Sequence, residues 1–229
     1  MKILTISDEE CSALWEYYLP GRLKEYDLII SCGDLKSEYL RFLVTMARCP
    51  VLYVHGNHDT TYHLDPPDGC DCIDDHFVTF NGLRIIGLGG CRKYHPGPHQ
   101  YTEREMRSRI RRLKWLLWLH GGVDIVVTHA PPFGLGDGED PAHRGFEALR
   151  ELLEEYQPQY LLHGHVHMRY GSDQTRVRKY ENTTLINTCE RYTLEIPDVP
   201  CREKDRGRVI WKTPHREEDP SSFYPKGCD

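Results

Sequence analysis

The chain has 229 residues, a formal net charge of −6 and an isoelectric point near 6.1. This length is sufficient for one α/β domain with a sizeable core, and no break in composition divides it. The acidic balance argues against a generic binder of nucleic acid or of anionic membranes, although a local basic surface could still bind phosphate. We therefore expect one globular domain with no membrane and no nucleic-acid polymer as partner.

Cysteine usage and the start of the chain both favour the cytoplasm. The nine cysteines are an odd number, and Cys32 and Cys189 lie in apolar strand-like runs, which fits a reducing compartment better than a disulfide scaffold. The chain opens on a strand-like run without the features of a signal peptide, and no run reaches transmembrane length. Cys70 and Cys72 could bind a metal but have no second pair, so thiols in a polar loop are the simpler interpretation.

Strand-like and helix-like segments alternate along the chain. Short apolar runs predict strands over residues 2–7, 27–32, 51–55, 77–80, 83–88, 124–128, 160–163, 184–187 and 192–196. Helical periodicity predicts helices over residues 37–47, 103–119 and 146–156, with Thr102 as the N-cap of the second and Pro158 ending the third. Asn81-Gly82 predicts a hairpin turn. This order predicts parallel strands in the first half, antiparallel additions in the second, and helices outside.

The end of the chain differs in composition. After Pro197 it carries Pro, Arg, Glu and Asp with few large apolar residues, apart from Val209-Ile210-Trp211 and Phe223-Tyr224. Such a segment buries too little apolar surface to form a core of its own. We predict a domain over residues 1–196 and a polar extension over residues 197–229 that packs on the domain or trails from it.

Polar side chains follow several of the apolar runs, where each strand is predicted to end. They are Asp8, Gly33-Asp34, Gly56-Asn57-His58-Asp59, His129 and Gly164-His165-Val166-His167. Carboxyl ends of parallel strands meet at one edge of a sheet, so we expect these side chains to converge there. A pair of cations needs a bridging carboxylate and terminal ligands from His, Asn and Asp on loops that leave open positions. The sequence therefore predicts a metal site for phosphate chemistry.

Each element alone has a simpler explanation. Gly33-Asp34 is an ordinary turn dipeptide, Asp8 an ordinary residue at a strand end, and a single His129 is more often a satisfied polar group than a ligand. The Gly-Asn-His-Asp and Gly-His-x-His elements are far more specific. Because all five occur in order, each after an apolar run, we favour the site.

This set resembles the calcineurin-like metallophosphoesterase superfamily over roughly residues 1–196, and is most similar to its small bacterial-type phosphodiesterases and phosphatases. The resemblance rests on Asp8, Gly33-Asp34, Gly56-Asn57-His58-Asp59, Thr128-His129-Ala130-Pro131-Pro132 and Gly164-His165-Val166-His167. It implies a four-layer α/β/β/α sandwich of two mixed sheets flanked by helices, with a dinuclear metal centre at the loop edge.

The resemblance also implies roles for individual residues. Asp34 would bridge the metals, with Asp8 and His167 on the first and Asn57, His129 and His165 on the second. His58 would stabilise or protonate the leaving group, Asp59 would orient His58, and a bridging hydroxide would be the nucleophile.

Glu10 departs from the family pattern. The family's first block is usually Asp-x-His, whereas this chain has Asp8-Glu9-Glu10. A carboxylate at Glu10 could coordinate the first metal directly or through water; alternatively Glu10 turns away and the metal is held weakly. We favour coordination, and we expect two divalent or trivalent ions, Mn or Fe, with Zn, Ni or Co as alternatives. On this view Glu10→Ala weakens the first metal more than the second.

Two polar segments are candidates for substrate binding. Residues 91–101 form either a surface connection or a lid that contacts substrate through Arg92 or Tyr94. Residues 140–145 could bring His143 or Arg144 towards a phosphate, although a helix cap explains them nearly as well. The helix predicted at 103–119 carries a basic stripe, which we interpret as a solvated face; it consists of Arg104, Arg107, Arg111 and Lys114.

We predict a metal-dependent hydrolase of phosphoric ester bonds that acts on a small phosphodiester or phosphomonoester. A non-catalytic protein-binding scaffold on the same fold is the alternative. A nuclease would need an extended basic groove or a further DNA-binding domain, and this acidic chain offers little of either.

Overall fold

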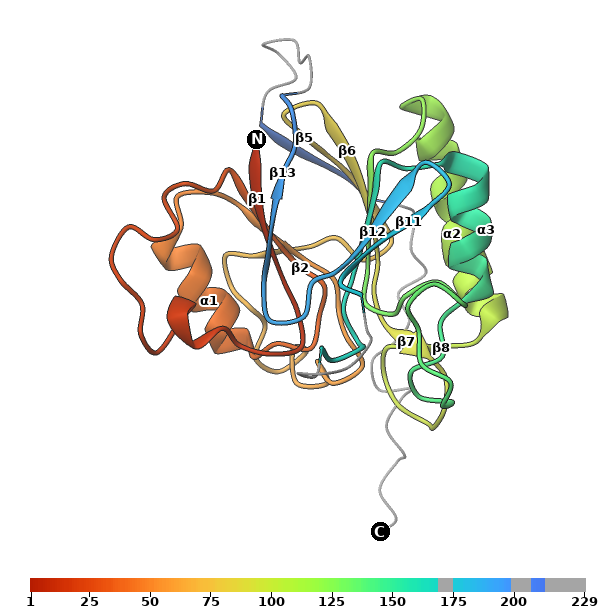
Figure 1. Ribbon diagram of the computed structural model, residues 1–229, viewed down its shortest axis with the longest axis horizontal. Coiled ribbons are helices and arrows are strands. Elements are labelled where there is room, and N and C mark those ends of the chain that lie inside the picture. Colours follow the sequence, from red (N-terminus) through yellow and green to blue (C-terminus); the bar gives the residue numbers. More distant parts are fainter. Residues whose placement is uncertain (169–174, 199–206, 213–229) are drawn as a thin grey trace.

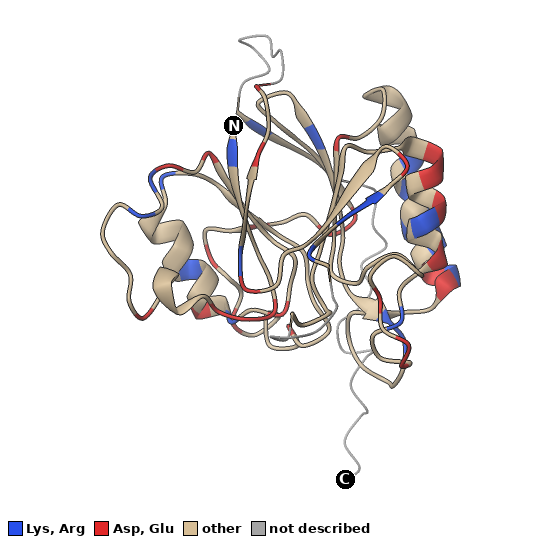
Figure 2. Ribbon diagram, viewed as in Figure 1, with Lys and Arg blue, Asp and Glu red and all other residues tan. Residues whose placement is uncertain are grey.

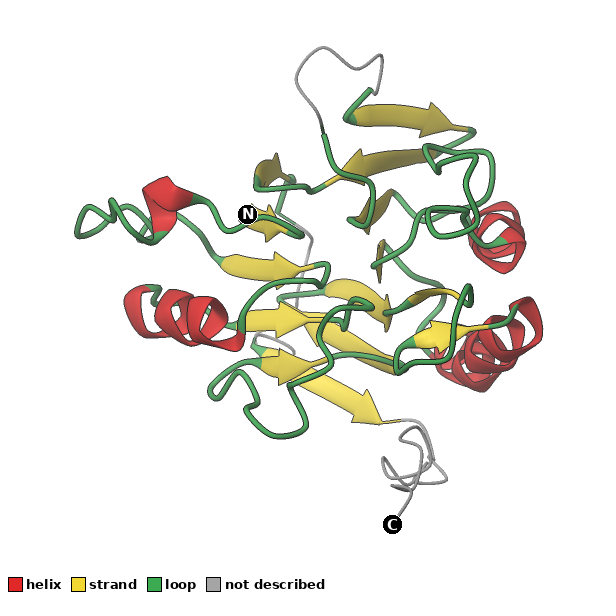
Figure 3. Ribbon diagram, turned by 90° about the horizontal axis from the view of Figure 1, so that it is seen from below, coloured by secondary structure: helices red, strands yellow, loops and turns green. Residues whose placement is uncertain are grey.

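Two mixed β-sheets pack against each other at the centre of the computed structural model, and helices cover their outer faces (Figures 1 and 3). The structure describes residues 1–168, 175–198 and 207–212. This arrangement confirms the predicted four-layer α/β sandwich. Within the described part of the chain, no helix is long and apolar enough to cross a membrane.

The first sheet has five strands and the second has seven. In spatial order the first contains β13 (Tyr192–Glu195), β1 (Lys2–Ile6), β2 (Leu28–Ser31), β3 (Val51–Tyr53) and β4 (Asp71–Cys72). The second contains β11 (Val177–Tyr180), β12 (Thr183–Asn187), β10 (Tyr160–His163), β9 (Ile125–Thr128), β6 (Leu83–Leu88), β5 (His76–Phe80) and β14 (Arg208–Lys212). A separate two-stranded ladder joins β7 (Cys91–Arg92) and β8 (Gln100–Tyr101).

The central strands are apolar on both faces because both faces are covered. Ile3 and Ile30 point into the core between the sheets, whereas Leu4 and Ile29 pack under α1 (Ser37–Met46). Adjacent strand residues point to opposite faces, so a strand between a sheet and a helix needs apolar residues at every position. On the other side of the molecule, α2 (Glu103–Leu119) and α3 (Glu147–Tyr156) cover the seven-stranded sheet.

Local signals set the ends of several elements. Thr102 caps α2 as predicted: its hydroxyl accepts from the backbone N–H of Glu105, whose carboxylate accepts from the N–H of Thr102. The Asn81-Gly82 turn joins β5 and β6 as an antiparallel hairpin, with both residues at positive φ. Every predicted strand and helix is present, with ends shifted by at most two residues.

The predicted division into parallel and antiparallel halves is wrong for the second sheet. There β6, β9, β10 and β12 are parallel, and antiparallel strands stand outside them. Strands β4, β7, β8, β11 and β14 were not predicted, because the first three are only two residues long and β11 is largely exposed. β14 lies in the predicted extension and pairs with β5; Phe223-Tyr224 falls outside the described residues.

The basic stripe on α2 faces the acidic surface of α3. Arg107 bonds Glu151 through two nitrogens, and Lys114 bonds Glu155 at 2.8 Å. Figure 2 shows the resulting mixture of acidic and basic residues on this helical layer. These exposed pairs agree with the interpretation of the stripe as a solvated face.

Candidate metal centre

The carboxyl ends of the parallel strands of both sheets lie at one edge of the molecule, the lower edge in Figure 1. Asp8, Asp34 and His165 follow three of these strands and adopt left-handed backbone conformations, with φ of 62°, 57° and 67°. Residues other than glycine rarely adopt such angles, and they persist where the surrounding structure holds them, often at functional sites. The loop edge therefore holds three residues whose backbone conformation the surrounding structure maintains.

Two glycines let the backbone pass close to the acidic side chains. A Cβ added to Gly56 would lie 2.0 Å from Asp34 Oδ1, and one added to Gly164 would lie 2.5 Å from Asp8 Oδ2. No side chain fits at these distances. The glycines of the two specific motifs are thus required by the approach of the carboxylates.

Four acceptor atoms converge between the sheets. His129 Nε2 lies 3.2 Å from Asp34 Oδ2, 3.1 Å from Asn57 Oδ1 and 3.1 Å from His165 Nδ1. His129 and His165 each use their other ring nitrogen on a backbone carbonyl, that of Cys32 at 2.8 Å and that of Ala142 at 2.7 Å. Because a carbonyl only accepts, those two nitrogens carry protons, which leaves His129 Nε2 and His165 Nδ1 as the nitrogens that can bind an ion. A cation satisfies such a donor set, so these residues fit a metal ion.

The charges of the cluster also favour a cation. Burial alone would lower the pKa of His129, but the carboxylates of Asp34 and Asp8 raise it to about 10. Burial would likewise raise the pKa of Asp34, but His129 lowers it to about 2. Burial and the charge of His129 lower the pKa of His165 to about 3. The carboxylates thus attract one positive charge to the position where the acceptors meet.

Asp8 joins this cluster through the backbone. Both of its oxygens accept from the N–H of His165, at 2.9 and 3.1 Å. Asp34, Asn57, His129 and His165 are therefore brought together as predicted, with Asp8 beside them.

The carboxylate of Asp59 binds the backbone of two site loops, and its predicted orientation of His58 stays a prediction. Its carboxylate accepts from the N–H groups of Gly56 and Asp34 at 2.7 and 2.9 Å, and it is buried. The side chain of His58 is exposed, and its backbone N–H donates to Asp34 Oδ1 at 2.7 Å. Asp59 thus fixes the two metal-site loops to each other, and His58 stands at the open rim.

Glu10 is not brought to the cluster. Its carboxylate lies 3.6 Å from Lys36 Nζ, whereas the preceding Glu9 lies 3.1 Å from His167 Nδ1. Metal coordination by Glu10 and His167 stays a prediction. The residue of this block that faces His167 is Glu9.

The three candidate substrate residues have different surroundings. Tyr94 reaches the centre, because its hydroxyl oxygen accepts from Asn57 Nδ2 at 3.5 Å. His143 lies at the rim with its ring centroid 5.2 Å from that of His165. Arg92 instead approaches Glu103, at 3.9 Å.

Residues 140–145 do not cap the helix that follows. Asp140 accepts from the backbone of Ala142 and His143 in a turn of its own, and α3 has Phe146 at its N-cap with no side-chain bond. The free N–H groups at the start of α3 donate instead to Glu103 of α2. The cap interpretation is therefore wrong, and the turn serves to place Ala142 and His143 against His165.

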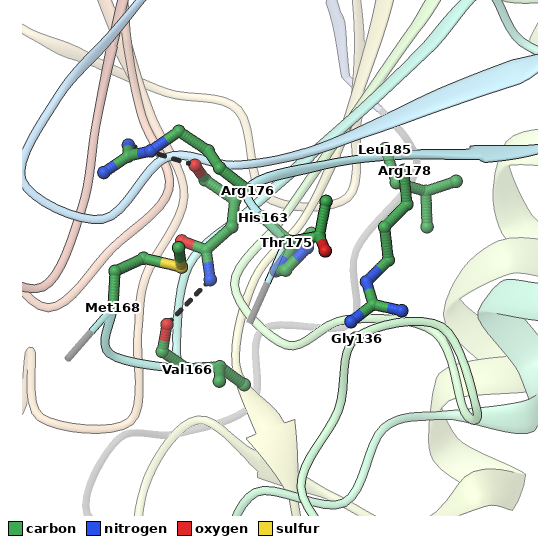
Figure 4. A pocket seen from close by; sticks show the side chains of 9 residues that line it. Gly136, His163, Val166, Met168, Thr175, Arg176, Arg178 and Leu185 are labelled. Atoms are coloured by element: carbon green, nitrogen blue, oxygen red, sulfur yellow. Dashed lines mark hydrogen bonds between the residues drawn. The ribbon is translucent and has the colours of Figure 1, made fainter. Parts of the chain in front are cut away.

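A small pocket lies directly beside the Gly164–Val166 turn (Figure 4). It is lined by Gly136, His163 and Val166 together with Arg176, Arg178 and Asn187. Asn187 donates to the carbonyl of Val166 at 2.7 Å, and Arg176 donates to the carbonyl of Asn187 at 3.3 Å. These bonds hold the turn that carries His165 and His167.

The family model for calcineurin-like phosphoesterases matches residues 5–169. The chain belongs to the calcineurin-like phosphoesterase family. As a calcineurin-like phosphoesterase it is a hydrolase of phosphoric ester bonds. The matched residues include the whole cluster of Asp34, Asn57, His129 and His165.

Two curated relatives and one solved structure are similar to this chain. The UPF0046 protein K07C11.7 of Caenorhabditis elegans is 27% identical over 222 residues, which cover 83% of this chain and 70% of that protein. A lariat debranching enzyme of Caenorhabditis briggsae is 24% identical, over 65% of this chain and 42% of its own length. The protein TT1561 of Thermus thermophilus superimposes with a TM-score of 0.54 at 16% identity, covering 82% of this chain and 89% of that one, which shows the shared fold.

A buried ionic network behind the Asn57 loop escaped the sequence analysis. Asp74 accepts from the ring and backbone of His55 at 2.6 and 3.1 Å and lies 3.5 Å from Arg109. Arg109 also bonds Asp75 at 2.6 Å and the carbonyl of Gly89 at 2.6 Å. The only sequence signal was an arginine on the otherwise apolar face of α2, four residues from Leu113.

Proposed function

We propose that this protein hydrolyses a small phosphate ester at a dinuclear metal centre built on Asp34. The observation that supports this most directly is the convergence of Asp34, Asn57, His129 and His165 through four acceptor atoms. A buried carboxylate, an amide oxygen and two imidazole nitrogens around one point form a ligand set that suits a cation. The residues of a second ion would lie towards Asp8 and His167.

The ions, when bound, would polarise the phosphoryl oxygens and supply a hydroxide nucleophile near neutral pH. The chain itself fixes the ligands. Cys32 and Ala142 set the tautomers of the two histidines, and Asp59 ties the Asp34 and Gly56 backbones together. Pre-positioned ligands of this kind require no rearrangement during the reaction.

The rim of the centre would handle the leaving group. His58 is exposed next to Asn57, where its imidazole can give a proton to the departing oxygen. The hydroxyl of Tyr94 accepts from the amide nitrogen of Asn57, and the amide oxygen of Asn57 faces His129. The side chain of Tyr94 is partly exposed to solvent. His143 lies beside His165, where it can contact a phosphate oxygen.

The test is turnover of an aryl phosphomonoester and an aryl phosphodiester by metal-stripped protein to which Mn, Fe, Zn, Ni, Co or Mg is added in turn. Asp34→Asn preserves the shape of the side chain but removes the charge, and Asp68→Asn makes the same change at an exposed carboxylate outside the centre. We expect metal-dependent turnover in the wild type and in Asp68→Asn, and its loss in Asp34→Asn. Absence of turnover with every metal would favour the scaffold, and the ratio between the esters identifies the substrate class.

A further inference from the structure

Three potential ligands from distant parts of the chain meet next to Asp8. The ligand atoms of Glu9, His167 and Cys189 all lie within 4.8 Å of one another. Glu9 Oε1 and His167 Nδ1 are 3.1 Å apart, and both side chains are exposed, whereas Cys189 is buried. The group is thus a buried sulfur covered by an open carboxylate and imidazole.

The position of Cys189 is fixed by the fold. It follows β12 and forms a parallel bridge with Ser7, which links the two sheets next to Asp8. Its N–H donates to Asn187 Oδ1 at 2.9 Å, and its carbonyl accepts from Arg176 at 3.0 Å. The backbone of Met168 hydrogen-bonds to the thiol. Backbone contacts of this kind hold and support a sulfur ligand in metal sites.

We propose that Glu9, His167 and Cys189 bind a divalent cation of the zinc class, with Cys189 as a thiolate ligand. The proposal deepens the proposed function, because it names the ligands of the ion that would lie beside Asp34 and rests on that centre. The family's usual Asp-x-His block supplies a histidine that Asp8-Glu9-Glu10 lacks. The sulfur of Cys189, which follows β12, would take the place of that histidine.

The donor set selects the metal. Sulfur, nitrogen and oxygen ligands together suit zinc and cobalt, whereas all-oxygen sites suit magnesium, calcium and manganese. Ligand atoms around a tetrahedral zinc ion stand about 3.3 to 3.6 Å apart for bonds of about 2.0 to 2.3 Å. The 3.1 Å between Glu9 and His167 is close to this range, and the sulfur of Cys189 lies within 4.8 Å of both ligand atoms. Three ligands leave a fourth position for the shared Asp34 carboxylate, water or phosphate.

A second group of similar composition does not carry the same inference. His55, Cys72 and Asp74 also lie within 4.8 Å of one another. There, however, Arg109 brings a positive charge to 3.5 Å from the Asp74 carboxylate. The arginine would repel a cation, so this group is a buried ion pair.

Cobalt(II) titration of the metal-stripped, reduced full-length protein tests the proposal. Cobalt bound to a thiolate gives an intense near-ultraviolet charge-transfer band that oxygen and nitrogen ligands do not give. We expect this band in the wild type and in Cys49→Ser, a control at a half-buried cysteine outside the centre, and its loss in Cys189→Ser. Glu9→Gln should weaken cobalt binding at this band about tenfold, and Glu10→Gln should leave it unchanged.

A sulfur neighbour in the zinc X-ray absorption spectrum of the unmodified protein supports the proposal without any variant, in case Cys189→Ser fails to fold. Cobalt or zinc binding without a thiolate signal, or a band that survives in folded Cys189→Ser, would overturn it. These outcomes are separate from those of the proposed function. Hydrolysis by a protein that lacks the thiolate signal would refute only the ligand assignment, and the signal in a protein without hydrolysis would refute only the phosphoesterase.

Discussion

Replacing Arg109 with methionine should destabilise the protein strongly, because the guanidinium is the cation of a buried network. Arg109 is 4% exposed and bonds Asp75, Asp74 and the carbonyl of Gly89 at 2.6, 3.5 and 2.6 Å. Removing one partner of a buried ion pair costs about 3 to 5 kcal/mol, since the other charge stays behind. Asp75 keeps Arg112 at 3.1 Å and Asp74 keeps His55, so we expect the lower end, about 3 kcal/mol.

Urea unfolding followed by fluorescence and far-ultraviolet circular dichroism measures this change. Arg111→Met is the matched control, because Arg111 is exposed on the same helix and should change the free energy of unfolding by about 0.5 kcal/mol or less. The thermal midpoint of Arg109→Met should fall by roughly 6 to 12 °C. A loss below about 1 kcal/mol, or one equal to that of Arg111→Met, would refute the network as a structural support.

Other predictions follow from the loops and charges of the site. Gly56→Ala would displace Asp34, whose Oδ1 stands 2.0 Å from the added Cβ, so turnover should fall about a hundredfold while circular dichroism keeps a folded spectrum; unchanged turnover would contradict the close approach. Burial alone would raise the pKa of Asp74, but His55 and then Arg109 lower it, so its stabilisation is full above pH about 4 and is lost in more acid solution. In Asp74→Asn, the free energy of unfolding should therefore fall less steeply as the pH is lowered below about 4. An unchanged slope would show that the Asp74 carboxylate does not cause this loss of stability. A divalent metal at a hundred times its Kd should raise the free energy of unfolding by about 2.7 kcal/mol in calorimetry, and Asp34→Asn should abolish most of that gain.

Much of the centre could be predicted from sequence because one rule locates it. Asp34, Asn57, His129 and His165 each follow an apolar strand, and parallel strands bring such positions to one edge whatever the loops between them do. The same rule applies to Cys189, which follows β12, but a cysteine after an apolar run is more often a buried small residue.

Side-chain direction is the part that spacing does not determine. Asp8 adopts a left-handed conformation, and the turn after it directs Glu9 to His167 and Glu10 to Lys36. Residue spacing alone therefore does not predict which of the two glutamates faces His167. The direction of the Asp59 carboxylate is likewise not determined by spacing, because it accepts from the backbone N–H groups of Gly56 and Asp34.

Long-range pairing was the other source of error. β14 pairs with β5 although more than a hundred residues separate them, and nothing local to Val209-Ile210-Trp211 identifies that partner. Asp75 and Arg109 likewise come from different elements, and their contact depends on the packing of α2 over the seven-stranded sheet.

Hydrolysis by this protein should depend on ions held at the Asp34 centre. The most direct test is to follow hydrolysis of the preferred aryl phosphate while metal is added in measured equivalents to the stripped protein, with bound metal determined in the same samples. We predict turnover that rises with bound metal and reaches its plateau at two ions per chain, with Asp34→Asn binding fewer ions and remaining inactive. Full turnover in the stripped protein, or in Asp34→Asn, would contradict the account.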